Sequence, residues 1–130
     1  MIININYDND ITIEEEDLIG EISILSENGS IDETDTFIDS WLFSLIDLYT
    51  NFKNGKNVKI DLVEEPAPLI GTILSNGFSI QYGNKKIYFQ NLNEFGVALK
   101  AASKKVINDF KTSSALTNNE IYKKILEFIY

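Results

Sequence analysis

The sequence predicts an α+β fold in a single domain, residues 1–130: an antiparallel β-sheet of about four to six strands with three helices packed on one face. Three observations predict it. Residues 34–52 carry the longest helical pattern, several short segments alternate apolar and polar residues, and two further helical patterns close the chain. A chain of 130 residues has the usual length of one domain.

The central helix is predicted over residues 34–52. Its apolar residues recur at the i, i+3, i+4 and i+7 spacing of one buried helix face, and they include Trp41, the only tryptophan. We therefore expect Trp41 in the core. Thr36 and Asp39 have the spacing of a capping box, so the helix is expected to begin near this threonine.

Strands are predicted on both sides of this helix. Residues 2–7 and 21–26 alternate apolar and polar side chains, and a short strand is expected at 11–13. Asn54 and Gly55 stop the helix. After it, a strand is expected at residues 56–62, followed by an extended crossing loop with two prolines. A meander then covers residues 69–75, 78–82 and 85–90, with turns at Asn76-Gly77 and Gly83-Asn84.

Two amphipathic helices are expected at the end of the chain. Residues 93–111 place Phe95, Leu99 and further apolar residues on one stripe. The last helix is predicted over residues 117–130, beginning at a second capping-box sequence. Because the helix stops at Tyr130 with no polar tail, we expect this end to dock on the rest of the domain.

Charge is strongly segregated along the sequence. The formal net charge is −9, from 20 acidic residues and 11 lysines. Residues 1–52 contain thirteen acidic residues and no base, whereas residues 53–130 contain seven acidic residues and all eleven lysines. Such a distribution repels nucleic acid and anionic lipid and attracts a basic partner, so we expect neither nucleic acid nor membrane as a partner. An ordinary solubilising surface is the alternative explanation.

The residue types that are missing restrict the chemistry. The chain has no cysteine, histidine or arginine, which removes thiolate nucleophiles, the usual near-neutral proton carrier and the bidentate phosphate clamp. Residues 8–14 resemble the start of a calcium loop, but Ile13 stands where the loop needs glycine and Ile19 where it needs glutamate. We expect no metal, no cofactor and no enzymatic activity.

The sequence also predicts a cytoplasmic protein. No apolar run approaches the roughly 18 to 20 residues that cross a bilayer. The first residues lack the positive segment of a signal peptide. The absence of cysteine suits a reducing compartment.

An acidic surface is the best candidate for a binding site. Phe43 lies off the apolar stripe of the central helix, with Asp39 and Asp47 four residues before and after it. An aromatic anchor ringed by carboxylates suits a protein interface, in which the charges steer association. Burial of Phe43 under the acidic N-terminal segment is the alternative. The expected surface comprises Asp35, Asp39, Phe43, Asp47, Glu14, Glu15, Glu16, Asp17, Glu64 and Glu65.

The segments WLFSLIDLY and KIDLVEEPAPL, with the Asn-Gly hairpin that follows them, resemble small acidic bacterial immunity proteins that are encoded beside polymorphic toxins. Contact-dependent growth inhibition immunity proteins are the nearest class, and the resemblance covers residues 21–111. It implies a cytoplasmic inhibitor that binds a cognate toxin domain, often a basic nuclease, and blocks its active site or substrate path. Immunity families share no catalytic signature, so the resemblance assigns no functional residue.

Two other functions are compatible with the sequence. A structural or adaptor protein would form a homo-oligomer through the last helix, with Ile125, Phe128 and Tyr130 buried between subunits. The sequence is therefore compatible with either a monomer or a homodimer. A small hydrolase would use Glu64 and Glu65 as paired carboxylates in a concave pocket. Adjacent residues on an extended chain usually point to opposite faces, which favours exposed loop acids instead.

Overall fold

The computed structural model describes residues 1–7, 18–110 and 120–130. Within them, seven strands and three helices confirm the α+β class. Where the sequence predicted one sheet, the strands form two antiparallel sheets, ordered β1-β2-β3 and β4-β5-β6-β7. The elements, in chain order, are β1 (Ile2–Tyr7), β2 (Ile19–Ser26), β3 (Gly29–Phe37), α1 (Ile38–Lys53), β4 (Val58–Ile60), β5 (Leu69–Leu74), β6 (Gly77–Tyr82), β7 (Lys85–Phe89), α2 (Leu92–Phe110) and α4 (Glu120–Ile129).

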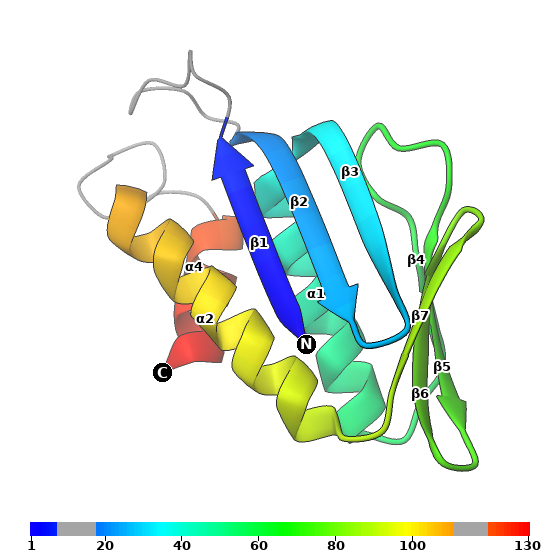
Figure 1. Cartoon of the computed structure of the whole chain (residues 1–130). Coiled ribbons are helices and arrows are strands. Elements are labelled where there is room, and N and C mark those ends of the chain that lie inside the picture. The colour runs from blue at the N-terminus through cyan, green and yellow to red at the C-terminus, as the bar shows by residue number, and fades with distance from the viewer. Residues whose placement is uncertain (8–17, 111–119) are drawn as a thin grey trace.

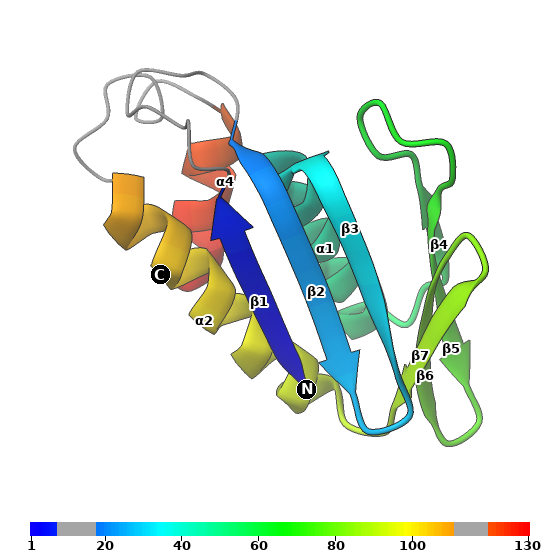
Figure 2. The same ribbon diagram turned by 45° about the horizontal axis from the view of Figure 1, so that its top comes forward.

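The two sheets stand side by side around α1. This helix lies behind the three-stranded sheet, α2 runs along β1, and the four-stranded sheet stands beyond β3 (Figure 1, Figure 2). In the first sheet Ile3 pairs with Ile24 and Ile5 with Ile22, so these alternate residues form one buried face. The predicted strand at 2–7 is confirmed.

The boundary between β3 and α1 differs from the prediction. The strand continues to Phe37, and the helix begins at Ile38, with no side-chain cap. Thr36 is not a helix cap, because it pairs with Gly20 of β2 and its hydroxyl bonds elsewhere. The predicted end of the helix is confirmed, since Gly55 follows it in the left-handed conformation with φ of 72°.

The predicted meander is confirmed as β5, β6 and β7, and the strand predicted at 56–62 joins its edge as the shorter β4. Its first hairpin joins Leu74 to Gly77, and its second joins Tyr82 to Lys85. A Cβ atom on Gly77 would lie 2.5 Å from the carbonyl oxygen of Phe89, so only glycine fits there.

The sheets meet at β7 through side-chain contacts. The backbone N–H of Tyr88 donates to Oδ1 of Asn28 over 3.1 Å, and Lys85 Nζ donates to the carbonyl oxygen of Asp32 over 2.7 Å. Single hydrogen bonds from or to side chains therefore pair some backbone groups at the edges of β3 and β7, in place of a continuous ladder. In the described residues the strands therefore form two sheets, where the sequence predicted one.

The core is built around α1, as its apolar stripe predicts. Trp41, Leu42, Leu45 and Leu48 are completely buried, which confirms the expected position of the tryptophan. The helix contacts both sheets and both other helices. The ring of Trp41 packs edge to face against that of Tyr82, with the ring centroids 5.1 Å apart.

The last two helices complete the core. In α2 the predicted stripe of Phe95, Leu99, Ala102 and Val106 is buried. On α4, Ile125 is buried within the chain and Phe128 packs on Tyr49, whereas Tyr130 is 93% exposed. The helix is therefore packed on the rest of the chain, and its central isoleucine is not free to meet a second copy. The expectation that the end at Tyr130 is docked is wrong, because that side chain faces solvent. The predicted start of this helix at residues 117–119 lies outside the described residues.

Candidate protein-binding surface

The strongest candidate site lies where β3 ends, α1 begins and the loop at residues 61–68 passes. A hydrogen bond between side chains holds this junction together. Thr36 Oγ1 donates to Oε1 of Glu65 over 2.5 Å and accepts from Nε1 of Trp41 over 2.9 Å. Because Thr36 and Trp41 are almost completely buried, the loop is fastened to the core at this point.

The other oxygen of Glu65 is bound by a buried tyrosine. Tyr82 OH donates to Oε2 of Glu65 over 2.9 Å, and Glu33 also hydrogen-bonds this phenol. Burial and then the bonds to Glu33 and Glu65 raise the pKa of Tyr82 well above its ordinary value. The phenol therefore stays protonated and keeps donating its one hydrogen to the carboxylate of Glu65.

Two strained residues adjoin this junction. Asp35 and Glu64, with φ of 49° and 59°, are the residues other than glycine that have positive φ in the described part of the chain. One immediately precedes Thr36 and the other immediately precedes Glu65, so both flank the same hydrogen bond. Left-handed backbone costs about 1 kcal/mol or more for such residues. Both side chains are exposed, so their charges face solvent.

A groove of about 240 Å³ borders the same loop, between α1 and β4. Its apolar residues are Phe43, Ile60 and Val63, and the valine is 57% exposed. The backbone N–H of Val63 donates to Ser40 Oγ over a long 3.4 Å. We call this the apolar groove, and its remaining residues are Ser40, Ser44 and Asp61.

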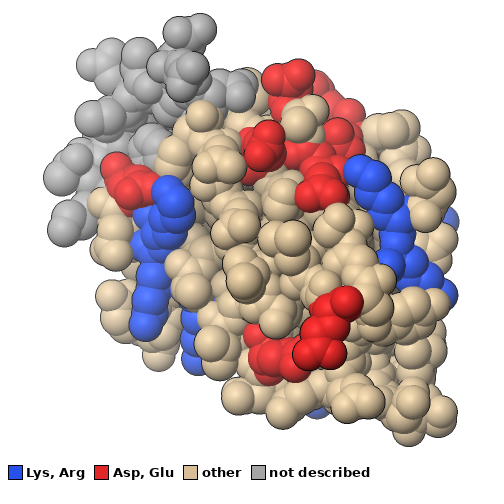
Figure 3. All heavy atoms as spheres, in the orientation of Figure 1, with Lys and Arg blue, Asp and Glu red and all other residues tan. Residues whose placement is uncertain are grey.

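The junction belongs to a larger concentration of carboxylates. Figure 3 shows acidic side chains gathered over the upper ends of β2 and β3, with lysines beside them toward the four-stranded sheet. We call this region the acidic end, and it comprises Glu21, Asp32, Glu33, Asp35, Glu64 and Glu65.

One member of the acidic end has a lysine beside it. Hydrogen bonds from Ser23 and Ser30, with the charge of Lys85, hold the pKa of Asp32 below its ordinary value. This carboxylate therefore stays ionised. Lys85 marks the border at which the acidic end gives way to the lysines of β7.

The structure does not place Asp39 on this surface. Only 6% of the residue is exposed, and its Oδ1 accepts the backbone N–H of Ser40 over 3.0 Å. The expected exposure of Asp39 is therefore wrong. The helix begins inside the molecule, where the N–H of Ile38 donates to the carbonyl oxygen of the buried Leu18, so its first turn is covered.

Asp47 is half-buried and forms an ion pair with Lys124 of α4. Its charge is cancelled locally, contrary to the expectation that it adds to an acidic face. The same ammonium lies 3.6 Å from the centre of the Phe43 ring, which is also half-buried. The aromatic ring therefore contacts α4 on one side and lines the apolar groove on another.

Three of the predicted acidic residues, Asp35, Glu64 and Glu65, are brought together. Glu14, Glu15, Glu16 and Asp17 lie outside the described residues. The sequence reasoning missed Glu33, Val63 and Tyr82. Of these, Tyr82 could have been found from the sequence, since a tyrosine on the buried face of a strand needs a partner for its hydroxyl.

Comparisons with protein-family models, with curated proteins and with solved structures find no match to this chain. Among the helices in the described part of the chain, none is both long enough and apolar enough to span a bilayer. Within residues 1–7, 18–110 and 120–130, no three acidic side chains are grouped so that they could hold a metal ion.

Proposed function

We propose that this chain is an inhibitor of the immunity type: a small acidic cytoplasmic protein that binds a cognate toxin domain and neutralises it. The partner is a protein with a basic surface, possessing an apolar side chain at the centre of that surface. Binding would cover the surface that the toxin uses for its own substrate, which for a nuclease is nucleic acid.

The observation that carries this proposal is the contact between the apolar groove and the acidic end. Val63 belongs to the groove, and the next two residues, Glu64 and Glu65, belong to the acidic end. Protein interfaces combine an apolar centre, which supplies most of the affinity, with a polar rim. Here Phe43 and Val63 would form the centre, and Asp35 and Glu64 part of the rim.

The fold suits rapid binding without rearrangement. Glu65 is held by Thr36 and Tyr82, so the loop that carries Val63 and Glu64 is already positioned before a partner arrives. A positioned loop loses less conformational entropy on binding. The carboxylates on this loop attract a basic partner over a distance of about one Debye length, roughly 8 Å at physiological salt.

Co-expression tests the proposal. The candidate to be tested is the toxin domain of a large secreted protein, where one is encoded immediately upstream of the gene for this chain. Expression of that domain alone should stop growth, and co-expression with this chain should restore growth and yield a one-to-one complex. Growth arrest that persists despite normal levels of this chain, with no complex on size exclusion, would contradict the proposal.

A further inference from the structure

The wall that α1 contributes to the apolar groove carries a buried hydroxyl group. Ser44 lines the groove and is only 4% exposed. A serine or threonine inside a helix often returns its hydroxyl to the carbonyl oxygen four residues earlier, as Thr50 does with Ile46 over 2.9 Å. Ser44 makes no such bond, and its hydroxyl has no other hydrogen-bond partner in the described part of the chain. The groove therefore contains a buried polar group whose capacity for hydrogen bonding is unused.

The other walls of the groove are mainly apolar. They are formed by the half-buried side chains of Phe43 and Ile60 and by the exposed side chain of Val63. At about 240 Å³ the groove is smaller than the pockets of roughly 300 to 1,000 Å³ that hold small-molecule ligands. Its size therefore suits one side chain of a partner protein.

The rim of the groove is negatively charged. Asp61 lines the groove, is exposed and forms no ion pair within the described residues, and Glu64 directly follows Val63. The ammonium group of Lys124, which lies against the Phe43 ring, is paired with Asp47. A partner surface that is complementary to this rim is basic.

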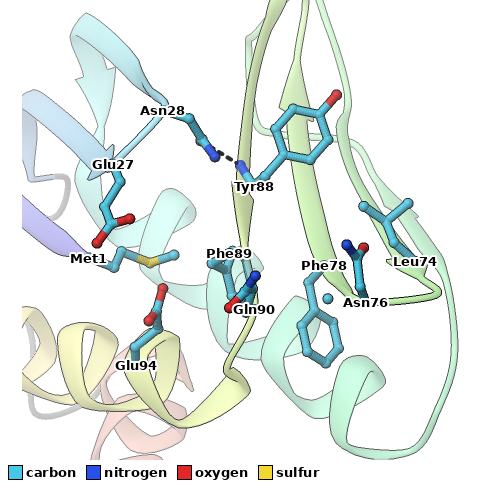
Figure 4. Close-up of a pocket in the computed structure, with 11 residues that line it drawn as sticks. Met1, Glu27, Asn28, Leu74, Asn76, Phe78, Tyr88, Phe89, Gln90 and Glu94 are labelled. Carbon is cyan, nitrogen blue, oxygen red and sulfur yellow. Dashed lines mark hydrogen bonds between the residues drawn. The ribbon is translucent and has the colours of Figure 1, made fainter.

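A larger cleft, of about 460 Å³, is lined by residues of the β2–β3 turn, the β5–β6 hairpin, β7 and the first turn of α2. Figure 4 shows that the chain's own Met1 side chain occupies the space between Glu27 and Glu94. The cleft also carries the ring of Tyr88, which is 43% exposed. It is therefore a useful comparison site, because an aromatic probe that binds without specificity would also reach this ring.

We propose that the apolar groove receives a tyrosine side chain, carried on a partner surface whose neighbouring residues are basic. This inference rests on the proposed function, and it names the side chain that the groove would bind. The ring of the tyrosine would pack on Phe43, Ile60 and Val63. Its phenol hydroxyl would form a hydrogen bond with Ser44 Oγ, which can both donate and accept.

Other side chains fit the groove less well. Leucine or phenylalanine would bury the hydroxyl of Ser44 without giving it a partner, which costs free energy. Lysine would bring its ammonium group out of water between apolar walls, beside the ammonium of Lys124. Tyrosine combines an apolar ring with one hydroxyl, and it is enriched among the residues that dominate binding energy at protein interfaces.

Capped tripeptides test this inference on the protein alone, without the toxin domain. The peptides lysine-tyrosine-lysine and lysine-phenylalanine-lysine differ by one hydroxyl group, and glutamate-tyrosine-glutamate reverses the flanking charge. Each is titrated at about 150 mM salt, so that distant charges are screened. The backbone amide NMR signals of Ser44 and Val63 report binding in the groove, and that of Tyr88 monitors the larger cleft. We expect the basic tyrosine peptide to bind about fivefold more tightly than the phenylalanine peptide, and the acidic peptide to bind more weakly than its basic counterpart.

Ser44→Ala should reduce the preference for tyrosine to less than about twofold, because alanine removes the hydroxyl while favouring the helix. Ser103→Ala is the matched control, since Ser103 on α2 is fully buried and its hydroxyl also lacks a hydrogen-bond partner. This control should leave the preference unchanged.

Four results would overturn the inference: equal binding of the two basic peptides, equal binding of the acidic peptide, a preference that persists in Ser44→Ala, or no saturable shift at Ser44 and Val63. A shift of the Tyr88 signal as large as that of Val63 would also overturn it, because binding would then not be specific to the groove. Growth that is restored in the co-expression test alongside any of these results would reject the tyrosine and retain the inhibitor function.

Discussion

Thr36 and Glu65 are joined by a hydrogen bond of 2.5 Å that links the end of β3 to the loop between β4 and β5. The same threonine hydroxyl accepts the indole N–H of Trp41. One small side chain therefore connects a strand, a helix and a loop. In this account the bond also positions the candidate interface, because Val63 and Glu64 immediately precede the glutamate that it holds.

Replacing Thr36 with valine should lower the free energy of unfolding by about 1–3 kcal/mol. The change keeps the shape of the side chain but leaves the Trp41 N–H without an acceptor in a buried site. Urea unfolding followed by tryptophan fluorescence measures the effect. Thr34→Val is the matched control, because Thr34 is exposed on the same strand, and it should change stability by less than about 0.5 kcal/mol. Equal effects of the two substitutions would show that the hydroxyl contacts are unimportant.

The protein should lose stability in alkaline solution through two tyrosines. Burial and then the bond to Asp109 raise the pKa of Tyr7, and burial with the bonds to Glu33 and Glu65 raises that of Tyr82. A group whose folded pKa is raised contributes its full stability below its unfolded pKa, here about 10, and loses it as pH rises further. The free energy of unfolding should therefore fall above about pH 10. Tyr82→Phe should make this fall less steep, and an unchanged slope would contradict the assigned cause.

Gly20 should tolerate no side chain. A Cβ atom at this position of β2 would lie 2.2 Å from the backbone oxygen of Asn6, which cannot move without disrupting β1. Gly20→Ala should therefore destabilise the protein by about 1–3 kcal/mol or more. Gly29→Ala is the comparison, because its nearest backbone atom would be 3.2 Å away. Thermal unfolding should show a much larger decrease in midpoint for the first variant, and similar midpoints would count against the close approach of the two strands.

The apolar groove should slow dissociation of the complex with the toxin domain. Val63→Ser removes an apolar side chain from the groove with little cost in folding, because 57% of the residue is exposed. We expect the complex with the toxin domain to dissociate about tenfold faster, since loss of an interface anchor commonly costs more than 1 kcal/mol. Val97→Ser on α2 is matched in chemistry and exposure, at 60% exposed, and should leave dissociation unchanged. Equal dissociation rates for the two variants would show that the groove is not part of the interface.

The main elements could be predicted because their patterns are local. The stripe around Trp41 on α1 and the Asn-Gly turn after β5 both depend on neighbours in the sequence. Thr36 was misassigned because threonine three residues before an acid is a capping signal only when no tertiary contact competes. Here strand pairing with Gly20 and the bond to Glu65 determine its conformation.

The candidate site was predicted in part for a related reason. Helical spacing places Asp39 away from the apolar stripe, but it carries no information about Leu18, which lies beside the first helical turn. Likewise, Asp47 meets Lys124 only because α4 folds back across α1. Asp35 and Glu64 lie on exposed backbone next to one long-range bond, so their side chains remain at the surface as expected.

If the carboxylates of the acidic end capture a basic partner, their charge should control the rate of association with that partner. Stopped-flow measurements with the toxin domain, over a range of salt concentrations, should compare the wild type with D35K/E64K and with E27K/E94K. The two double variants change the net charge equally, the first at the acidic end and the second at the β2–β3 turn and the first turn of α2. We predict that D35K/E64K slows association at low salt by about tenfold or more, and that the difference disappears at high salt. Equal slowing by both variants, or none by D35K/E64K, would contradict the account.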